Sequence, residues 1–380
     1  MKFAIMMRAI DQDSGFRAYT EALVDTMLKL DKQNDYLLLY RQPKYFGRFA
    51  HYPNVKEVLL NAPHKLLWDQ AAAPYTAWRE GADVIFNPKF SVPLISHCPV
   101  TMGLSEPAWW AWPDHYEPLD RYYNRLMLPL YVRKSAHLFP MSRFILEENR
   151  QVLGLPLENA TLTYSAPDER FRKIEDRRAL EPFREKYRLP EKYILSVTRV
   201  DHPGVENSTS FFPGKNPETT YRAYIKIRSQ VPHDLVFAGR RVREYLLHTE
   251  GQDLDLERVH FLNFVQREEM PFLYNLADLF VNPTYYEGCP NTLLEAMACG
   301  CPMVVANMAG AADVGEDAAL LADPYSVEDF AEKMCSVLTD ERLMQKLRSK
   351  SLQKATSFNW EHTAKCILEG LALAVGKSSP

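Results

Sequence analysis

Residues 281–305 read V-N-P-T-Y-Y-E-G-C-P-N-T-L-L-E-A-M-A-C-G-C-P-M-V-V, and the order of apolar and turn-forming residues in this segment indicates its secondary structure. A short apolar run is followed by a turn-rich loop that ends at Pro290. Residues 291–299 have a helical pattern, and Gly300 ends it before another apolar run begins. Strand, loop, helix and strand in this order form the unit of a parallel sheet, whose ligands bind outside the carboxyl ends of the strands.

Two carboxylates lie in this unit, Glu287 in the loop and Glu295 in the helix. Glu295 interrupts an apolar run, so we expect it to be buried, where a carboxylate needs hydrogen-bond donors such as a pair of sugar hydroxyls. The loop before the helix offers backbone N–H groups at the positive helix end, which suits a phosphate group. The alternative is a half-exposed helix from which Glu295 faces solvent.

The pattern E-G-x-P-x-x-x-x-E-A-M-A-x-G, which starts at Glu287, resembles the donor-site signature of retaining GT-B glycosyltransferases of family 4, the glycosyl transferases group 1. The resemblance implies that Glu287 lies beside the donor sugar and that Glu295 binds the ribose of the nucleotide. It also implies that the loop between them meets the sugar and the diphosphate. The loop residues concerned are Gly288, Cys289, Pro290, Asn291 and Thr292.

The resemblance covers nearly the whole chain and implies an α/β fold of two Rossmann-like domains, whose parallel sheets face each other across a cleft. We expect residues 1–170 to form an N-terminal acceptor domain and residues 171–358 to form the nucleotide-sugar donor domain. The C-terminal helix, within residues 359–380, is expected to cross back to the first domain. We expect the linker in the charged stretch 168–189.

Two cations are expected at the donor diphosphate. Arg199 follows the first strand of the second domain, and Lys215 precedes the helix expected at residues 218–228. In the family an Arg and a Lys at these positions point at the diphosphate, and two cations would neutralise a leaving nucleotide. The alternative is a pair of exposed surface charges. The resemblance further implies that Gly15, in the first loop, approaches the donor phosphate and that the loop containing Val265 meets the nucleobase.

The loop after the strand expected at residues 99–102 departs from the family pattern. Ser105 and Glu106 stand where the family has His-Asp, and a serine can donate a hydrogen bond but cannot titrate. Trp109 and Trp110 follow in the same loop. They predict either a stacking platform for a sugar or an aglycone, or anchors that hold a long loop on the core.

A long helix is expected at residues 119–136, where four basic residues stand among Tyr, Leu and Met. A helix of this kind suits a membrane surface, since many relatives act on lipid acceptors. The interpretation that we favour is an amphipathic helix with its apolar face on the core.

Composition excludes several classes of function. In a chain of 380 residues, 46% are hydrophobic and 25% are charged, as in ordinary globular proteins. The net charge of −4 gives no electrostatic reason to bind nucleic acid, and no apolar run approaches the ~18 residues of a spanning helix. The first residues read as a buried strand rather than a signal peptide. The cysteines and the Asp-x-Asp matches lack the spacing or placement of a metal site, so we expect no metal.

The sequence therefore predicts a glycosyltransferase that moves a sugar from a UDP-sugar, or alternatively a GDP-sugar, to a glycan, lipid or small-molecule acceptor. We expect retention of the anomeric configuration, no cofactor, and a cytoplasmic protein, with contact at the inner membrane face as an alternative. Two other functions stay open: another GT-B enzyme such as a nucleotide-sugar epimerase, and a non-catalytic nucleotide-sugar-binding partner subunit. The sugar, the acceptor, the linkage and the oligomeric state are left open.

Overall fold

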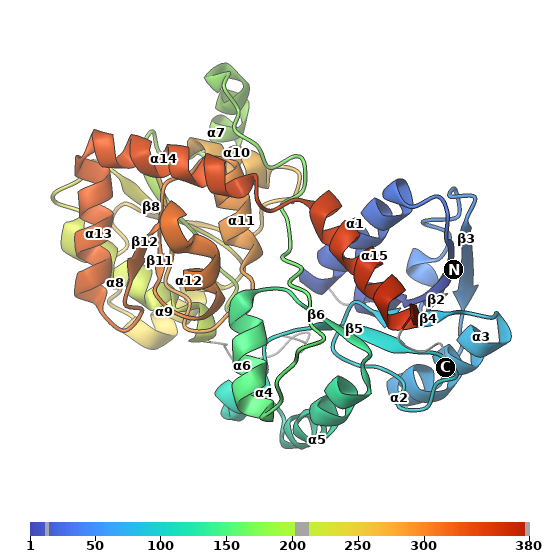
Figure 1. Cartoon of the computed structure of the whole chain (residues 1–380). Helices are drawn as coiled ribbons and strands as arrows, with labels where there is room; N and C mark the ends of the chain where they lie inside the picture. The colour runs from blue at the N-terminus through green and yellow to red at the C-terminus, as the bar shows by residue number, and fades with distance from the viewer. Residues whose placement is uncertain (12–14, 202–212, 377–380) are drawn as a thin grey trace. The chain divides into compact units, whose positions relative to one another are not determined.

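The chain divides into two compact units in the computed structural model, which describes residues 1–11, 15–201 and 213–376 (Figure 1). The first unit comprises Met1–Ser165 and Trp360–Pro380, and the second comprises Ala166–Asn359. The charged stretch 168–189, where we expected the linker, lies within the second unit. Each unit contains a six-stranded sheet with parallel strand pairs, as predicted for two Rossmann-like domains.

The first sheet has the strand order β3-β2-β1-β4-β5-β6. Its strands are β1 (Lys2–Met6), β2 (Asp35–Tyr40), β3 (Val55–Leu59), β4 (Val84–Asn87), β5 (Val100–Leu104) and β6 (His137–Pro140). In the central register Ile5 pairs with Leu38 on one side and with Phe86 on the other, and all three are fully buried. Helices that cover both faces of a parallel sheet explain why its central strands are almost continuously apolar.

The helices of this unit are α1 (Gly15–Leu30), α2 (Lys65–Leu67), α3 (Ala73–Arg79), α4 (Ala108–Ala111), α5 (Pro118–Lys134), α6 (Arg143–Leu153) and α15 (Trp360–Gly376). A π-helical turn, Trp68–Ala72, lies between α2 and α3, just before Pro74, which has no N–H to donate. Short 3₁₀ helices are η1 (Met7–Asp11), η2 (Pro43–Tyr45) and η4 (Pro113–His115).

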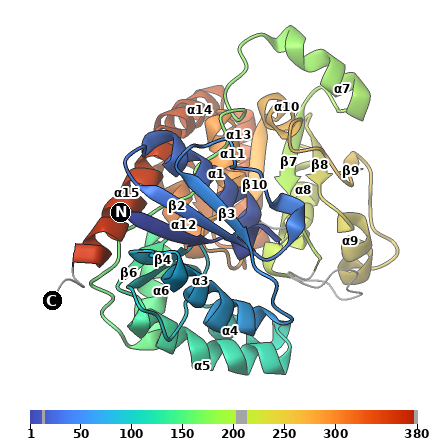
Figure 2. The same ribbon diagram turned by 90° about the vertical axis from the view of Figure 1, so that its right-hand side faces the viewer.

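Helix α15 lies near the C-terminus of the chain, belongs to the first unit and packs on the first sheet (Figure 2). Thr363 Oγ1 donates a hydrogen bond to the carbonyl of Tyr164 at 2.7 Å. Gly370 allows the close approach, because a Cβ there would lie 2.5 Å from the ring of Phe139 in β6. The C-terminal helix is therefore a layer of the first unit.

The second sheet has the strand order β12-β11-β10-β7-β8-β9. Its strands are β7 (Tyr193–Val197), β8 (Asp234–Ala238), β9 (Val259–Leu262), β10 (Leu279–Asn282), β11 (Met303–Ala306) and β12 (Leu320–Ala322). The chain order reverses between the neighbouring strands β7 and β10. In open parallel sheets, ligands bind at the carboxyl ends of the strands at such a reversal.

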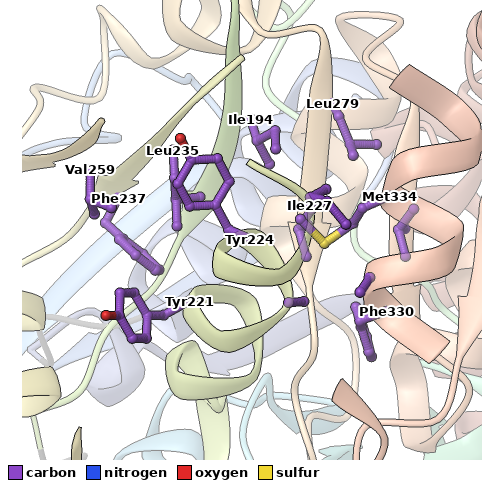
Figure 3. Packing of buried hydrophobic residues seen from close by; sticks show 14 of the residues in the cluster. Ile194, Tyr221, Tyr224, Ile227, Leu235, Phe237, Val259, Leu279, Phe330 and Met334 are labelled. Atoms are coloured by element: carbon purple, nitrogen blue, oxygen red, sulfur yellow. The ribbon is translucent and has the colours of Figure 1, made fainter. Parts of the chain in front are cut away.

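The helices of the second unit are α7 (Glu181–Tyr187), α8 (Pro217–Ile227), α9 (Val242–Glu250), α10 (Met270–Leu276), α11 (Asn291–Ala298), α12 (Ala309–Gly315), α13 (Val327–Thr339) and α14 (Glu341–Ala355), with 3₁₀ turns η5 (Arg177–Leu180), η6 (Pro213–Lys215) and η7 (Glu316–Ala318). Figure 3 shows one core of this unit, where Tyr224 of α8 and Phe330 of α13 pack beside Ile194 and Leu279 of the sheet. This core holds α8 against the sheet, and with it the loop that precedes α8.

Candidate functional site

The residues expected at the diphosphate gather at the carboxyl ends of β7 and β10. Arg199 follows β7 and is exposed, and Lys215 is the last residue of η6 before α8. Glu287 lies in the loop between β10 and α11. The stretch 202–212, between Arg199 and Lys215, lies outside the described residues.

Lys215 and Glu287 form an ion pair, with 2.5 Å between Nζ and Oε1. Both side chains are mostly buried, at 24% and 21% exposed. The second carboxylate oxygen of Glu287, Oε2, is buried and has no hydrogen-bond partner among the described residues. The structure thus joins two side chains that lie far apart in sequence, and it leaves one carboxylate oxygen available as an acceptor.

Backbone contacts between two loops fix this pair. The carbonyl of Gly214 accepts hydrogen bonds from Thr284 Oγ1 at 3.0 Å and from the N–H of Tyr285 at 2.9 Å. Asn216 is fully buried, caps α8 through its side chain, and donates from Nδ2 to the carbonyls of Pro283 and Pro324 at 2.9 and 3.0 Å. These bonds hold the residues on both sides of Lys215 against the loop that carries Glu287.

Gly310, in the second position of α12, supports the same loop from the other side. Its N–H donates to the carbonyl of Glu287 at 2.8 Å. A Cβ at Gly310 would lie 2.0 Å from the carbonyl oxygen of Gly288 and 2.6 Å from that of Glu287, which only glycine avoids. The sequence analysis missed this residue. Its signal in the sequence was a glycine shortly after the next strand. That signal indicates a close contact only once α12 is known to lie against the loop of Glu287.

Helix α11 begins directly after this loop, as predicted. Pro290 is the residue before its first turn, and no side chain caps the helix there. The positive end of the helix dipole therefore lies at residues 290–292, where the N-cap residue Pro290 supplies no side-chain acceptor. Cys289, beside it, has intermediate exposure.

Glu295 is buried at 5% exposed, so the solvent-facing alternative is wrong. Its donors come from the protein: Arg267 Nη1 donates to Oε1 and the hydroxyl of Tyr274 donates to Oε2, both at 3.1 Å. Burial raises the pKa of Glu295, and the positive charge of Arg267 opposes that shift. Arg267 belongs to the same β9–α10 connection as Val265, whose side chain is also buried. The sequence analysis predicted the buried carboxylate but missed both of its donors.

In the first unit, Gly15 is the exposed first residue of α1, while residues 12–14 of the first loop lie outside the described residues. Ser105 follows β5 and is buried, with its carbonyl accepting from Asn149 Nδ2 at 2.9 Å. Glu106, next to it, has intermediate exposure. Ser105 and Glu106 thus lie just after the carboxyl end of β5, and Gly15 begins the first helix after β1.

The two candidate tryptophans, Trp109 and Trp110, lie in the short helix α4 and differ in exposure. Trp109 is buried and packs on Phe90 with ring centroids 4.8 Å apart, so it anchors the loop on the core. Trp110 has intermediate exposure, and the guanidinium of Arg125 lies 5.7 Å from its ring centroid. Of the two residues, the stacking hypothesis therefore applies to Trp110.

A charged cluster that the sequence analysis missed lies near the ends of β1 and β4. Arg8 binds Asp69 through two hydrogen bonds of 2.8 Å. Lys89 follows β4, with its ammonium group 5.2 Å from the ring centroid of Phe16 and 5.1 Å from that of Phe90. Burial, and then the neighbouring Arg8 charge, lower the pKa of Lys89 to about 7. Nothing in the local sequence indicated this cluster, because Asp69 comes from a helix between the strands.

Within residues 1–11, 15–201 and 213–376, no group of three His, Cys, Asp or Glu side chains is placed to hold a metal ion. None of the described helices is both long and apolar enough to cross a membrane.

Comparison with known proteins gives matches in the second unit and over the whole fold. Residues 190–354 match the family model of glycosyl transferases group 1. The serotype-specific mannosyltransferase WbdA of Escherichia coli is 28% identical over 250 residues, which cover 62% of this chain and 29% of that protein. The chain thus spans less than a third of the length of this relative.

Solved structures match over the full length. Sucrose-phosphate synthase from Thermosynechococcus elongatus has a TM-score of 0.74 at 17% identity and covers 100% of both chains. Anabaena HepE in complex with UDP and glucose has a TM-score of 0.68 at 17% identity, covering 98% of this chain and 99% of that one. The chain therefore has the two-domain, Rossmann-like GT-B fold of glycosyltransferases, and most of its second unit is similar to glycosyl transferases group 1.

Proposed function

We propose that the protein is a glycosyltransferase that moves a sugar from a nucleoside diphosphate sugar to an acceptor. The observation that carries the proposal is the Lys215–Glu287 ion pair, which lies where the strand order reverses and beside an uncapped helix end. A cation, a helix N-terminus and a carboxylate together suit a diphosphate joined to a sugar. The match of residues 190–354 to group 1 glycosyl transferases supports the same function.

Each group has a role in this proposal. Lys215, Arg199 and the N-terminus of α11 bind the diphosphate, while Glu295 and the loop of Val265 hold the nucleoside. When Lys215 forms an ion pair with the diphosphate instead, Glu287 is released and its carboxylate can face the sugar. As the bond between the anomeric carbon and the phosphate oxygen breaks, positive charge develops on that carbon, and the carboxylate of Glu287 stabilises it. The electron pair of the bond leaves with the phosphate.

The charge of the diphosphate is balanced by side chains in this proposal, so transfer needs no metal ion. The donor is a UDP-sugar, since a similar fold has been solved with UDP and glucose, and GDP is the alternative base. Mannose is the first sugar to test, because WbdA is a mannosyltransferase. The acceptor binds to the first unit in this proposal, and Ser105, Glu106 and Trp110 are its candidate contacts.

Nucleotide binding tests the proposal directly. In buffer with EDTA, UDP or GDP at ~100 times its dissociation constant should add about 2.7 kcal/mol to the free energy of unfolding, seen as a higher melting temperature. Lys215→Ala should lose most of this shift. Lys354→Ala is the matched control, since Lys354 is similarly exposed (28%) and pairs with Glu316 at 2.7 Å.

Two results would count against it. A shift of equal size in Lys215→Ala and Lys354→Ala would remove Lys215 from the diphosphate site. A shift that appears only after Mg²⁺ or Mn²⁺ is added would contradict the metal-independent site.

We further propose that the anomeric configuration is retained, so that an α-linked donor gives an α-glycoside. In this route the acceptor attacks the face that the phosphate leaves, and the departing phosphate oxygen takes the acceptor proton. An inverting enzyme would need a general base for the acceptor, and Ser105 cannot act as one. Proton NMR of the first product from a glucose donor measures the anomeric coupling. A large coupling, hence a β-glycoside, would refute retention and make Glu106 the candidate base; an isomerised nucleotide-sugar would indicate an epimerase.

A further inference from the structure

The first sheet has its own reversal of strand order, between the neighbouring strands β1 and β4. Arg8 lies just after β1 and Lys89 just after β4, so both follow the carboxyl ends of the two strands at the reversal. Arg41 directly follows β2, the neighbour of β1 on its other side. Ligands bind at such a reversal in open parallel sheets, and here three adjacent strand ends each supply a cation.

A buried acid holds the guanidinium of Arg8 in one orientation. Asp69, in the π-helical turn, is 3% exposed and accepts both hydrogen bonds from Arg8. Ser91 Oγ donates to the same carboxylate at 3.3 Å. Among the described residues, Arg8 donates from its side chain to Asp69 alone, through Nε and Nη2. The other N–H groups of this guanidinium, including those of Nη1, are therefore available as donors in a fixed direction.

Arg41 has no hydrogen-bond or ion-pair partner in the part of the chain that the structure describes, and its Nε is buried. Buried N–H groups without an acceptor are rare in native proteins, so this one points to an acceptor from outside the chain. Burial raises the pKa of Asp11, and the charges of Arg41, Arg8 and Arg17 oppose that shift. The three guanidinium groups therefore lie close enough to act on one carboxylate.

Lys89 connects this group to the loop after β5. Its ammonium group lies near the rings of Phe16 and Phe90. Burial, and then the Arg8 charge, lower its pKa to about 7, while Lys65 and Glu106 act on it in opposite directions. The cluster is therefore near Glu106, a candidate contact of the acceptor. A cation that has lost part of its hydration is stabilised strongly by a bound anion.

Positive charge exceeds negative charge in the cluster. Its members are Arg8, Arg17, Arg41, Lys65 and Lys89 against Asp11, Asp69 and Glu106, an excess of two when all are charged. A phosphate monoester carries about −1.5 to −2 charges at pH 7 and offers three acceptor oxygens. The charge and the donors of the cluster thus match a phosphate group.

We propose that Arg8, Arg41 and Lys89 bind a phosphate group of the acceptor. The proposal rests on the proposed function, which takes the first unit as the acceptor-binding one, and it narrows the acceptor to a phosphate ester. The two guanidinium groups donate to phosphate oxygens, and Lys89 acts as a point charge. Arg41 gains the acceptor that its buried Nε lacks, and Arg8 donates while it stays bound to Asp69. A sugar phosphate and an isoprenoid phosphate share this chemistry.

Calorimetric titration of the full chain at saturating UDP tests the site, because an acceptor has to bind while the nucleotide is in place. Glucose 6-phosphate should bind at least about tenfold more tightly than glucose, since hydrogen bonds to a charged group are the strong ones. Arg41→Gln and Lys89→Gln should each weaken its binding by about tenfold and leave the affinity for glucose unchanged. Arg8 stays unchanged in these variants, because its loss would leave Asp69 buried without its cation.

The matched control is Arg133→Gln. Arg133 is exposed in the last turn of α5, before the amino end of β6 and hence at the opposite edge of the sheet. This variant should bind glucose 6-phosphate as the wild type does. Circular dichroism verifies that all three variants fold.

Citronellyl phosphate, a short isoprenoid phosphate, is the second probe, and whichever probe binds more tightly identifies the source of the phosphate. The proposal is overturned if neither phosphate ester binds more tightly than its alcohol, glucose or citronellol. It is also overturned if Arg41→Gln and Lys89→Gln bind both probes like Arg133→Gln, or if both probes bind only without UDP, since they then occupy the diphosphate site. Failure of UDP and GDP to bind would contradict the proposed function instead, and the same variants titrated without nucleotide would still decide on the phosphate site.

Discussion

Replacing Glu287 by Gln is expected to lower the turnover of sugar transfer by about 10²- to 10³-fold, the size of effect seen when one transition-state stabilising group is removed. Gln keeps the size of the side chain and one carbonyl acceptor, but it removes the negative charge. In the proposed mechanism that charge acts on the cationic anomeric carbon, which exists only near the transition state. Turnover should therefore fall much more than donor affinity.

The same substitution should affect stability and nucleotide affinity differently. Glu287 and Lys215 are 21% and 24% exposed, and Gln still offers Lys215 a carbonyl oxygen as hydrogen-bond acceptor, so the melting temperature should change little. In Glu287→Gln, no ion pair of Lys215 has to break before Lys215 binds the diphosphate. UDP or GDP should therefore bind this variant at least as tightly as they bind the wild type. Lys215→Ala should weaken nucleotide binding, and the two variants therefore separate charge at the diphosphate from charge at the sugar.

Initial rates and melting curves measure these effects, with Glu316→Gln as the control. Glu316 is also paired with a lysine, at 2.7 Å, but it stands at the far end of α12. Its variant should keep full activity. Wild-type turnover in Glu287→Gln would remove Glu287 from the chemistry, whatever its effect on binding.

The sequence predicted the parts of this site that depend on local pattern. The strands β10 and β11 were visible because a parallel strand that is buried on both faces is apolar throughout. The burial of Glu295 followed from the apolar residues around it. Its donors could not be predicted, since Arg267 and Tyr274 precede it by 28 and 21 residues and belong to a different loop and helix.

Helix α5 shows a second limit. Its periodicity predicts a helix, and apolar residues occur on two sides of it. The pattern alone cannot decide whether Leu128 or Leu126 faces the core, because that depends on where the sheet lies. For the same reason, the sequence could not decide whether Trp109 and Trp110 anchor the segment on the core or form a stacking platform for a ligand. Each alternative needed the position of a residue distant in the chain, Phe90 for Trp109 and Arg125 for Trp110.

Gly310 depends on such a distant contact, and Gly310→Ala is expected to lower both stability and turnover. The added Cβ would lie 2.0 Å from the carbonyl oxygen of Gly288, so the backbone must move. Forcing a side chain into a packed site costs about 1–3 kcal/mol, which should appear as a lower melting temperature. The moved segment carries Glu287, and a displacement of ~1 Å at a reacting group can lower the rate by about 10²-fold.

Gly315→Ala separates these two effects because it lies in the same helix. The heavy atoms nearest a Cβ at Gly315 are side-chain atoms of Val305 (Cγ2, 2.9 Å), Ala319 and Leu321, and none of these residues belongs to the Glu287 loop. This variant should lose stability and keep its turnover below the melting temperature. Gly376→Ala should change neither, since no heavy atom lies within 4 Å of a Cβ there. If Gly310→Ala and Gly315→Ala have the same melting temperature and lose turnover equally, Gly310 affects the reaction only by stabilising α12. A selective loss in Gly310→Ala means that the contact between α12 and the β10–α11 loop sets the position of Glu287.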